Sequence, residues 1–165
     1  MAESFSFDVV SDFDRQELVN TLDQVKREIS QRYDLKGTDT SVELDKENIF
    51  IITNSELTLN AVNDIIRQKA IKRNLSLKIF DYGEIEMVSG NRIKQTILLK
   101  QGIKQEIAKK ISKDIRDKIK KINVSINGET LRVASKSKND LQLAIKLVSQ
   151  LEESLNIPLK ANNFR

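Results

Sequence analysis

The stretch that decides the fold is VELDKENIFI at residues 42–51, because VSINGETLRV at residues 124–133 matches it without a gap. Apolar residues occupy the same positions in both stretches, on either side of a polar turn. The flanking segments align at the same offset of 82 residues. The chain is therefore predicted to contain one fold twice. Two copies are too few for a solenoid, which needs at least about three repeats to bury a continuous core.

Each copy is predicted to fold as a strand, a helix, a hairpin, a helix and a strand. In the first copy, alternation over 5–9 predicts a half-buried strand, and helical spacing predicts helices over 18–29 and 59–70. A hairpin is expected at 42–51 and a closing strand at 75–80. In the second copy, strands are expected at 92–100 and from Pro158, helices at 103–119 and 141–155, and a hairpin turn at Asn127 and Gly128.

Two helices on one face of a four-stranded antiparallel sheet form the ferredoxin-like arrangement. The predicted fold class is therefore α+β, a tandem duplication of a ferredoxin-like βαββαβ sandwich, with domains 1–90 and 91–165. A hairpin around Gly90 and Asn91 is expected to connect the copies, and an exchange of terminal strands between them stays open. The predicted core residues are Phe7, Val25, Ile29, Ile51, Ile66, Ile107, Ile111, Val133 and Val148.

The composition limits the possible functions. The 165 residues include no Cys, His or Trp, which excludes disulfides, Ser-His or Cys-His nucleophile pairs and zinc sites with the usual ligands. The sequence contains no phosphate-binding loop of the Gly-x-x-x-x-Gly-Lys type and no signal peptide or membrane-spanning run. We therefore expect a cytoplasmic protein that is not an enzyme and carries no metal or cofactor.

The charge differs between the two halves of the sequence. Residues 1–90 hold 11 Lys and Arg against 17 Asp and Glu, a net charge of −6. Residues 91–165 hold 17 against 7, a net charge of +10. A basic surface indicates a phosphate-bearing partner, either a nucleotide or a nucleic acid. The first copy is thus predicted to be acidic and the second basic.

A phosphate site is predicted in the second copy, where a basic, glycine-containing junction leads from a strand into a helix. Free backbone N–H groups and the helix dipole favour an anion at such a junction, although a plain turn that requires glycine would look the same. A stripe of cations on the following helix and one cation on the hairpin would add support; a solvated helix face explains the stripe equally well. The predicted nucleotide-binding residues are Lys100, Gln101, Gly102, Lys109, Lys113, Arg116 and Arg132.

Two further features of the first copy are candidates for ligand contact. Phe50 and Phe80 are expected on the outer face of the sheet, where RNA-recognition modules of this topology stack bases, although packing between domains would also use them. The loop at 33–37 is either a helix C-cap built on Gly37 or a second possible binding site.

Five separated motifs resemble the YajQ family of bacterial proteins: SFDVVS at 6–11, YDLKG at 33–37, LKQGI at 99–103, NDLQ at 139–142 and NFR at 163–165. The resemblance covers the whole chain. Two departures are Leu35, where the family usually has Phe, and Ser135, where Gly is common. The resemblance implies two ferredoxin-like domains and a nucleotide-binding, non-enzymatic role; some members are described as cyclic-di-GMP receptors and others as binding nucleotide or tRNA.

Three functions are consistent with these observations. The first is a receptor for a purine nucleotide, with cyclic-di-GMP favoured, which would pass its signal to a regulatory protein partner through the acidic copy. The second is an RNA-binding protein that uses the basic copy as an electrostatic surface. The third is a protein-interaction scaffold without a nucleotide.

Overall fold

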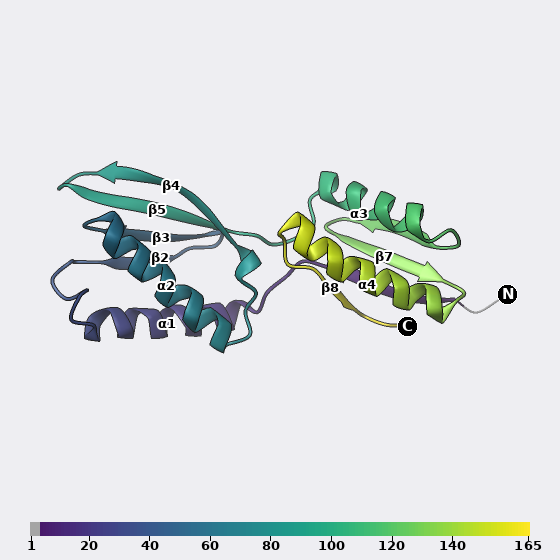
Figure 1. Cartoon of the computed structure of the whole chain (residues 1–165), viewed down its shortest axis with the longest axis horizontal. Helices are drawn as coiled ribbons and strands as arrows, with labels where there is room; N and C mark the ends of the chain where they lie inside the picture. The colour runs from purple at the N-terminus through teal and green to yellow at the C-terminus, as the bar shows by residue number, and fades with distance from the viewer. Residues whose placement is uncertain (1–3) are drawn as a thin grey trace. The chain divides into compact units, whose positions relative to one another are not determined.

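The computed structural model describes residues 4–165, and each sheet has four antiparallel strands with two helices on one face (Figure 1). The first half contains, in chain order, β1 (Phe5–Val10), α1 (Arg15–Gln31), β2 (Ser41–Leu44), β3 (Asn48–Thr53), α2 (Glu56–Lys72), the 3-10 helix η1 (Leu77–Ile79), β4 (Phe80–Val88) and β5 (Arg92–Leu99). The second half continues with α3 (Gln105–Lys118), β6 (Asn123–Asn127), β7 (Thr130–Ser135), α4 (Lys138–Leu155) and β8 (Lys160–Asn162).

The predicted class is confirmed: the fold is α+β, and the strand orders β6-β7-β1-β8 and β2-β3-β5-β4 are those of two ferredoxin-like sheets. Helix starts follow the local chemistry. Asp14 caps α1 by accepting from the N–H groups of Gln16 and Glu17, and Ser137 caps α4 by accepting from the N–H of Asp140 at 3.2 Å. The expected turn between β6 and β7 places Gly128 at φ +58°, which glycine adopts without strain.

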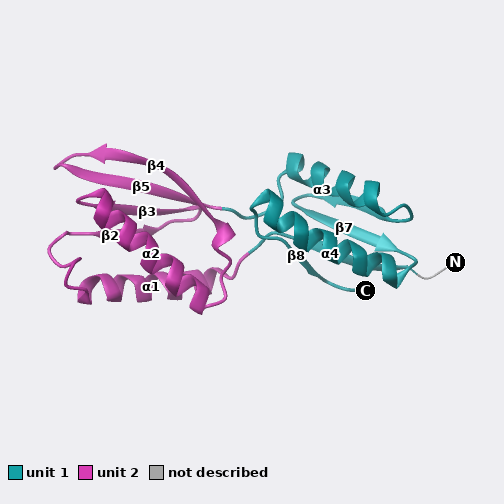
Figure 2. Ribbon diagram, in the orientation of Figure 1, with its two compact units in different colours: residues 1–12, 100–165 teal, residues 13–99 magenta. Residues whose placement is uncertain are grey.

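The division into domains differs from the expected boundary at residue 90. One compact unit comprises residues 1–12 and 100–165, and the other comprises residues 13–99 (Figure 2). We call them unit 1 and unit 2. The first strands of the two copies are exchanged: β1 pairs with β7 and β8 of the second copy, whereas β5 pairs with β3 and β4 of the first. The predicted hairpin around Gly90 and Asn91 forms between β4 and β5, but both strands belong to the sheet of unit 2. It therefore joins the two copies of the sequence and does not join the two units.

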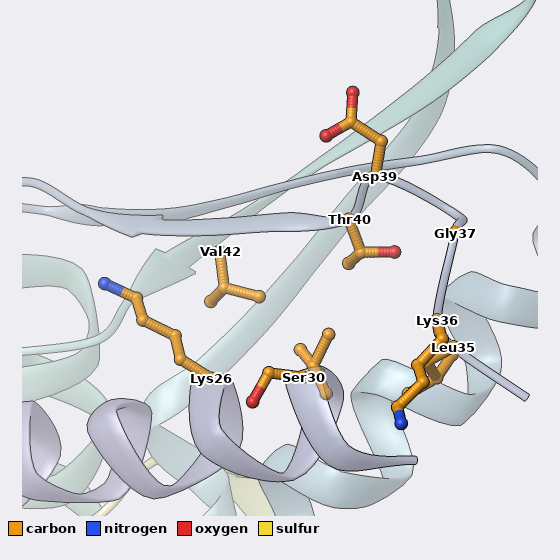
Figure 3. Close-up of a pocket in the computed structure, with 9 residues that line it drawn as sticks. Lys26, Ser30, Leu35, Lys36, Gly37, Asp39, Thr40 and Val42 are labelled. Atoms are coloured by element: carbon orange, nitrogen blue, oxygen red, sulfur yellow. The ribbon is translucent and has the colours of Figure 1, made fainter. Parts of the chain in front are cut away.

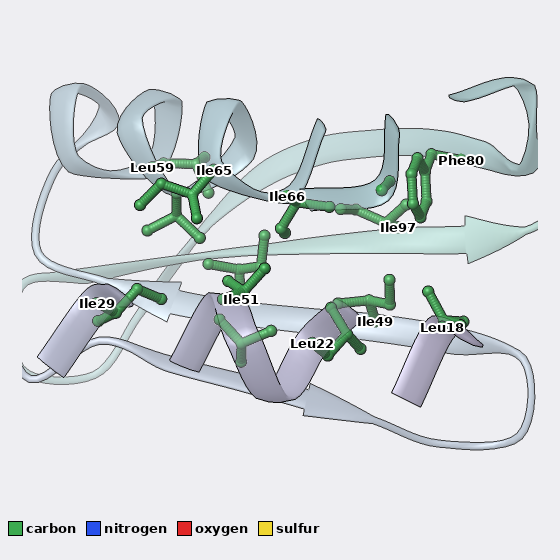
Figure 4. Close-up of a cluster of buried hydrophobic side chains, with 14 of the residues drawn as sticks. Leu18, Leu22, Ile29, Ile49, Ile51, Leu59, Ile65, Ile66, Phe80 and Ile97 are labelled. Carbon is green, nitrogen blue, oxygen red and sulfur yellow. The ribbon is translucent and has the colours of Figure 1, made fainter. Parts of the chain in front are cut away.

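The strand exchange follows from burial. Ile93, Ile97 and Leu99 of β5 enter the core of unit 2, and Phe7 and Val9 of β1 enter the core of unit 1. Figure 4 shows the first of these cores, in which Ile97 and Phe80 pack near Ile49. Burying each such side chain contributes about 1.5–3 kcal/mol, so the strands are held in these sheets by apolar contact as well as by hydrogen bonds.

Most of the core prediction is confirmed. Eight of the nine predicted core residues are buried, and only Ile107 is partly exposed at the edge of its cluster. The prediction of a strand at 75–80 was wrong, because Ser76 accepts a hydrogen bond from the N–H of Lys78 and turns the chain into η1. The outward placement of Phe80 was also wrong. Phe80 pairs with Leu99 on the inner face and is buried.

The exchange also redistributes charge. Unit 2 holds 13 Lys and Arg against 14 Asp and Glu, a net charge of −1. Unit 1 holds 15 against 10, a net charge of +5. The basic character predicted for the second copy persists in unit 1, but the contrast between the units is smaller than the contrast between the two halves of the sequence.

Candidate functional site

The junction predicted to bind phosphate lies between β5 and α3, and three of its hydrogen-bond donors already have partners. The N–H of Gly102 donates to the Ser11 carbonyl at 2.7 Å, and the N–H of Ile103 donates to the Glu129 carbonyl at 2.9 Å. The Lys100 ammonium donates to the Asn156 carbonyl at 2.8 Å. The helix itself begins only at Gln105. The junction therefore offers neither free N–H groups at Gly102 and Ile103 nor an unengaged lysine.

Gly102 has a conformational reason to be glycine. Its φ of +80° lies in the left-handed region, and a Cβ at this position would collide with the Glu129 carboxylate. That carboxylate also lies 3.7 Å from the Lys104 ammonium. An acidic group thus stands next to the glycine where an anion was expected, and repulsion from it would oppose phosphate there. The exposed side chain of Gln101 makes no hydrogen bond within residues 4–165.

The stripe on α3 forms as expected. Lys109, Lys113 and Arg116 are exposed on the side opposite Ala108, Ile111 and Ile115, which enter the core. Within the described part of the chain, neither Lys109 nor Lys113 has an ion-pair partner, and Arg116 donates to the Ser112 carbonyl at 3.4 Å. This helix face therefore presents unneutralised positive charge over about two turns.

Arg132 lies on the other face of the same sheet. It alternates with buried Leu131 and Val133 on β7, and its Nε lies 3.1 Å from the Asp8 carboxylate. Asn163 donates to the other oxygen of Asp8 at 2.8 Å. The hydrogen bond from Asn163, followed by that from Arg132, lowers the pKa of Asp8. The seven predicted residues therefore lie on the junction, on a helix face and on the opposite sheet face, and the structure does not bring them together.

A defined hollow occurs instead in unit 2, beside the second possible site named from the sequence. It lies between α1, the loop 32–40 and the start of β2, and its volume is about 320 Å³ (Figure 3). We call it the loop pocket. Its lining residues are Lys26, Ile29, Ser30, Leu35, Lys36, Gly37, Asp39, Thr40 and Val42.

Several contacts hold the loop around this pocket. Arg92 of β5 donates to the carbonyls of Thr38 and Asp39, and Arg32 makes a two-pronged contact with Asp34 at 2.9 and 2.7 Å. The Arg32 contact lowers the pKa of Asp34. Hydroxyl groups of Thr38, Thr40 and Thr53 form a chain with spacings of 2.7 and 2.8 Å. A loop fixed in this way can present a preformed surface to a ligand.

The pocket combines an apolar floor with a polar rim. Ile29, Leu35 and Val42 are buried and form the floor, so the departure from the family at Leu35 falls on a core side chain. Lys26 and Lys36 lie on opposite sides of the hollow, and Asp39 directs its carboxylate away from it (Figure 3). Gly37, at φ +78°, has open space around its Cβ position. The other departure, Ser135, is buried in unit 1 and hydrogen-bonds to the carbonyl of Lys121.

Aromatic side chains offer little stacking surface. Phe50 points outward on β3 as expected, but the ammonium of Lys94 lies 4.8 Å from the centre of its ring. Tyr82 lies on β4 beneath the guanidinium of Arg67, and burial raises the pKa of Tyr82. Tyr33, beside the loop pocket in sequence, is 94% exposed, and it is the aromatic side chain most available to a ligand among residues 4–165. Sequence reasoning named its loop only as a second choice.

Two features are absent from residues 4–165. No group of three or more carboxylates is placed to hold a metal ion. None of the helices is both long enough and apolar enough to cross a bilayer.

Comparison with known proteins gives the family. Residues 5–165 match the family described as nucleotide-binding protein YajQ-like. A protein of Prochlorococcus marinus strain AS9601, named as a nucleotide-binding protein, is 98% identical over the full length of both chains. Similarly named proteins of Prochlorococcus marinus strain MIT 9312 and Parasynechococcus marenigrum strain WH8102 are 92% and 56% identical, again over the full length of both. The chain therefore belongs to the YajQ-like family of nucleotide-binding proteins.

Proposed function

We propose that this protein is a non-enzymatic receptor for a purine nucleotide, with cyclic-di-GMP the favoured ligand, and that the ligand binds in the loop pocket. Relatives that match over their full length are named as nucleotide-binding proteins. The observation that carries the choice of site is the hollow itself, which joins an apolar floor to Lys26 of α1 and to Lys36 of a fixed loop. The role predicted for Lys100, Gln101 and Gly102 stays a prediction, and the existing partners of Lys100 and Gly102 argue against it.

The size of the pocket limits what it can enclose. Its volume of about 320 Å³ is at the lower end of the range of about 300–1,000 Å³ that is typical of small-molecule sites. Such a space suits a single nucleotide. A cyclic dinucleotide would place one of its nucleotides in the hollow and the other at the rim, beside the exposed Tyr33.

The chemistry of the lining supports a phosphorylated ligand. The ammonium groups of Lys26 and Lys36, on opposite sides, can each meet a phosphate oxygen, and cyclic-di-GMP carries two separate phosphates. The apolar floor of Ile29, Leu35 and Val42 can accept the face of a base or the ribose. Asp39 points its carboxylate elsewhere and does not oppose the phosphates.

A binding role fits this lining better than a catalytic one. The hydroxyl groups near the pocket, on Thr38, Thr40 and Thr53, are hydrogen-bonded to one another, and the sequence has no His that could act as a general base beside them. We therefore expect cyclic-di-GMP, GTP and ATP to remain intact on incubation with the pure protein. Turnover that persists through repurification and is lost in Asp or Glu variants would contradict this expectation.

RNA binding is the second candidate, and the unpaired cations of α3 favour it. Lys109 and Lys113 face solvent on unit 1, whose net charge is +5, and an extended polyanion could follow this helix face. Binding through several phosphates should weaken steeply as the salt concentration rises, whereas binding of a dinucleotide should depend much less on salt.

The experiment is calorimetry with cyclic-di-GMP, GMP, GTP, ATP and a short RNA on matched variants. Lys26→Ala and Lys36→Ala should each weaken nucleotide binding by about tenfold, because each removes a charged contact. Lys46→Ala, which removes an exposed lysine of the same unit outside the pocket, and Lys100→Ala should leave it unchanged. Loss of binding in Lys100→Ala alone would place the ligand on unit 1. Absence of heat with every ligand would favour the protein-interaction scaffold.

A further inference from the structure

Strand β4 leaves a long stretch of backbone unpaired at the edge of its sheet. It has nine residues, pairs only with β5, and ends the order β2-β3-β5-β4. Residues 83–87 are exposed without interruption. Along the outer side of such a strand, N–H and C=O groups are available to pair with another extended chain. We call this side the β4 edge.

Two apolar side chains of the β4 edge lack a cover. Ile85 and Met87 pair with Gln95 and Ile93, which point inward toward the helices, yet Ile85 is 41% and Met87 73% exposed. The tip of the β4–β5 hairpin extends beyond the start of α2 (Figure 1), and both side chains stay accessible to solvent. Flexible, polarisable Met side chains are common on surfaces that bind peptides.

A β-bulge decides which face of the sheet these two side chains occupy. The register of β4 against β5 shifts between Tyr82 and Ile85. Without the extra residue, alternation from the inward Tyr82 would place Glu84 and Glu86 on the helix side and turn Ile85 and Met87 to the other face. The bulge therefore determines that apolar side chains line one face of the edge and carboxylates the other.

Buried polar groups hold the bulge in place. Gln95 donates to the Gly83 carbonyl at 2.9 Å and accepts from Asn63 at 2.9 Å, and both amide side chains are buried. Within residues 4–165, the Asn63 Oδ1 atom is buried without a hydrogen-bond partner. A Cβ on Gly83 would lie only 2.7 Å from the Thr96 carbonyl oxygen. Burying amide side chains is costly, and apolar side chains would fill the same space at lower cost. We therefore interpret the hydrogen bonds of Asn63 and Gln95 as fixing the geometry of the β4 edge.

Charge identifies the kind of partner. Asp81, Glu84 and Glu86 lie on β4, and the strand carries no Lys or Arg. Lys94, the cross-strand neighbour of Glu86, places its ammonium over the ring of Phe50. These carboxylates would repel RNA, and two copies of β4 paired with each other would bring six carboxylates together.

We propose that the β4 edge is a docking strand that takes an extended, basic segment of a partner protein by β-augmentation. Alternate Lys or Arg side chains of the segment meet Glu84 and Glu86, and the intervening apolar side chains cover Ile85 and Met87. The partner's backbone completes the hydrogen bonds that β4 leaves open. This surface is separate from the loop pocket, and no nucleotide is needed for the contact.

The test uses the full chain and a short synthetic peptide in which Lys and Val alternate. Fluorescence anisotropy should show binding, and hydrogen exchange should slow at the backbone amides of residues 82–88. A peptide alternating Glu and Val should not bind, and neither should the Lys–Val peptide N-methylated at alternate residues, since it cannot pair along a strand. Failure of the Lys–Val peptide to bind, or equal binding of the N-methylated form, would overturn the proposal.

Variants separate the β4 edge from general electrostatics. The double variant Glu84→Lys/Glu86→Lys should weaken binding of the Lys–Val peptide by about tenfold or more, because lysines at these two positions repel the lysines of the peptide. Asp23→Lys/Glu43→Lys makes the same change in net charge at exposed sites elsewhere on unit 2 and should bind like the parent. Met87→Ala should weaken binding without altering the melting temperature. Equal effects of the two double variants, or a dimer cross-linked through β4, would refute the assignment.

Discussion

Replacing Phe7 by alanine tests the strand exchange directly. Phe7 lies in the first few residues of the chain, yet its ring is fully buried in unit 1, opposite Val133 and 5.9 Å from the ring of Phe164. Truncating a fully buried Phe costs about 3–5 kcal/mol. The free energy of opening of unit 1 should fall by this amount, which accelerates exchange of its most protected amides by roughly a hundredfold or more.

Hydrogen exchange followed residue by residue is the assay. In Phe7→Ala, amides of α3 and α4 should lose protection, and amides of α1 and α2 should keep theirs, although α1 follows Phe7 directly in the sequence. Ile97→Ala is the matched variant, because Ile97 lies on the other exchanged strand and is fully buried in unit 2. It should show the opposite pattern. Loss of protection in α1 and α2 on replacing Phe7 would refute the exchange.

Three further predictions follow from single contacts. Gly102→Ala should destabilise the protein by about 1–2 kcal/mol, because alanine is strained in the left-handed backbone conformation. Gly128→Ala carries the same backbone penalty but has open space around the new methyl group. In thermal unfolding, any stability that Gly102→Ala loses beyond the loss in Gly128→Ala therefore measures the collision with Glu129. The folded state lowers the pKa of Asp8, so the ionised carboxylate stabilises the fold at pH values above the unfolded pKa. This stabilisation is lost as the pH falls through the folded pKa. Thermal melts recorded across pH should show that Asp8→Asn lacks this part of the acid dependence of stability. Arg92→Ala should weaken nucleotide binding by about tenfold by loosening the loop 32–40, with Lys94→Ala as the unaffected control, and equal binding by both variants would contradict the role of the loop.

Local patterns were enough to predict most of the elements and the core. Helical spacing located α1 to α4, and the Asn127 and Gly128 turn located the second hairpin. The strand exchange could not be predicted in the same way. β1 and β5 are both alternating strands, and each presents a row of apolar side chains that would fit either sheet. Only three-dimensional packing decides between them.

The candidate site was harder to predict, because the decisive contacts join distant parts of the sequence. The basic junction at Lys100 looked open, but the carbonyls of Ser11 and Glu129 take up its N–H groups. Neither contact has a local signal. The loop pocket, by contrast, is lined by residues 26–42 alone, and its YDLKG motif was visible in the sequence. The sequence did not show that this loop is held in place around a pocket.

Strand exchange connects the fold to the proposed site. It places Asp8 and Asp12 in unit 1 and Arg92 and Lys94 in unit 2. Residues 1–12 and 100–165 together carry a net charge of +5 and residues 13–99 carry −1, in place of +10 and −6 for the two halves of the sequence. The smaller positive charge of unit 1 gives less support to RNA binding through electrostatic attraction alone. One of the transferred cations, Arg92, holds the carbonyls of Thr38 and Asp39 and so fixes the loop of the pocket. The proposed nucleotide site therefore depends on a strand that the internal repeat assigns to the other copy, and a chain ending at residue 90 would lack both this strand and its clamp.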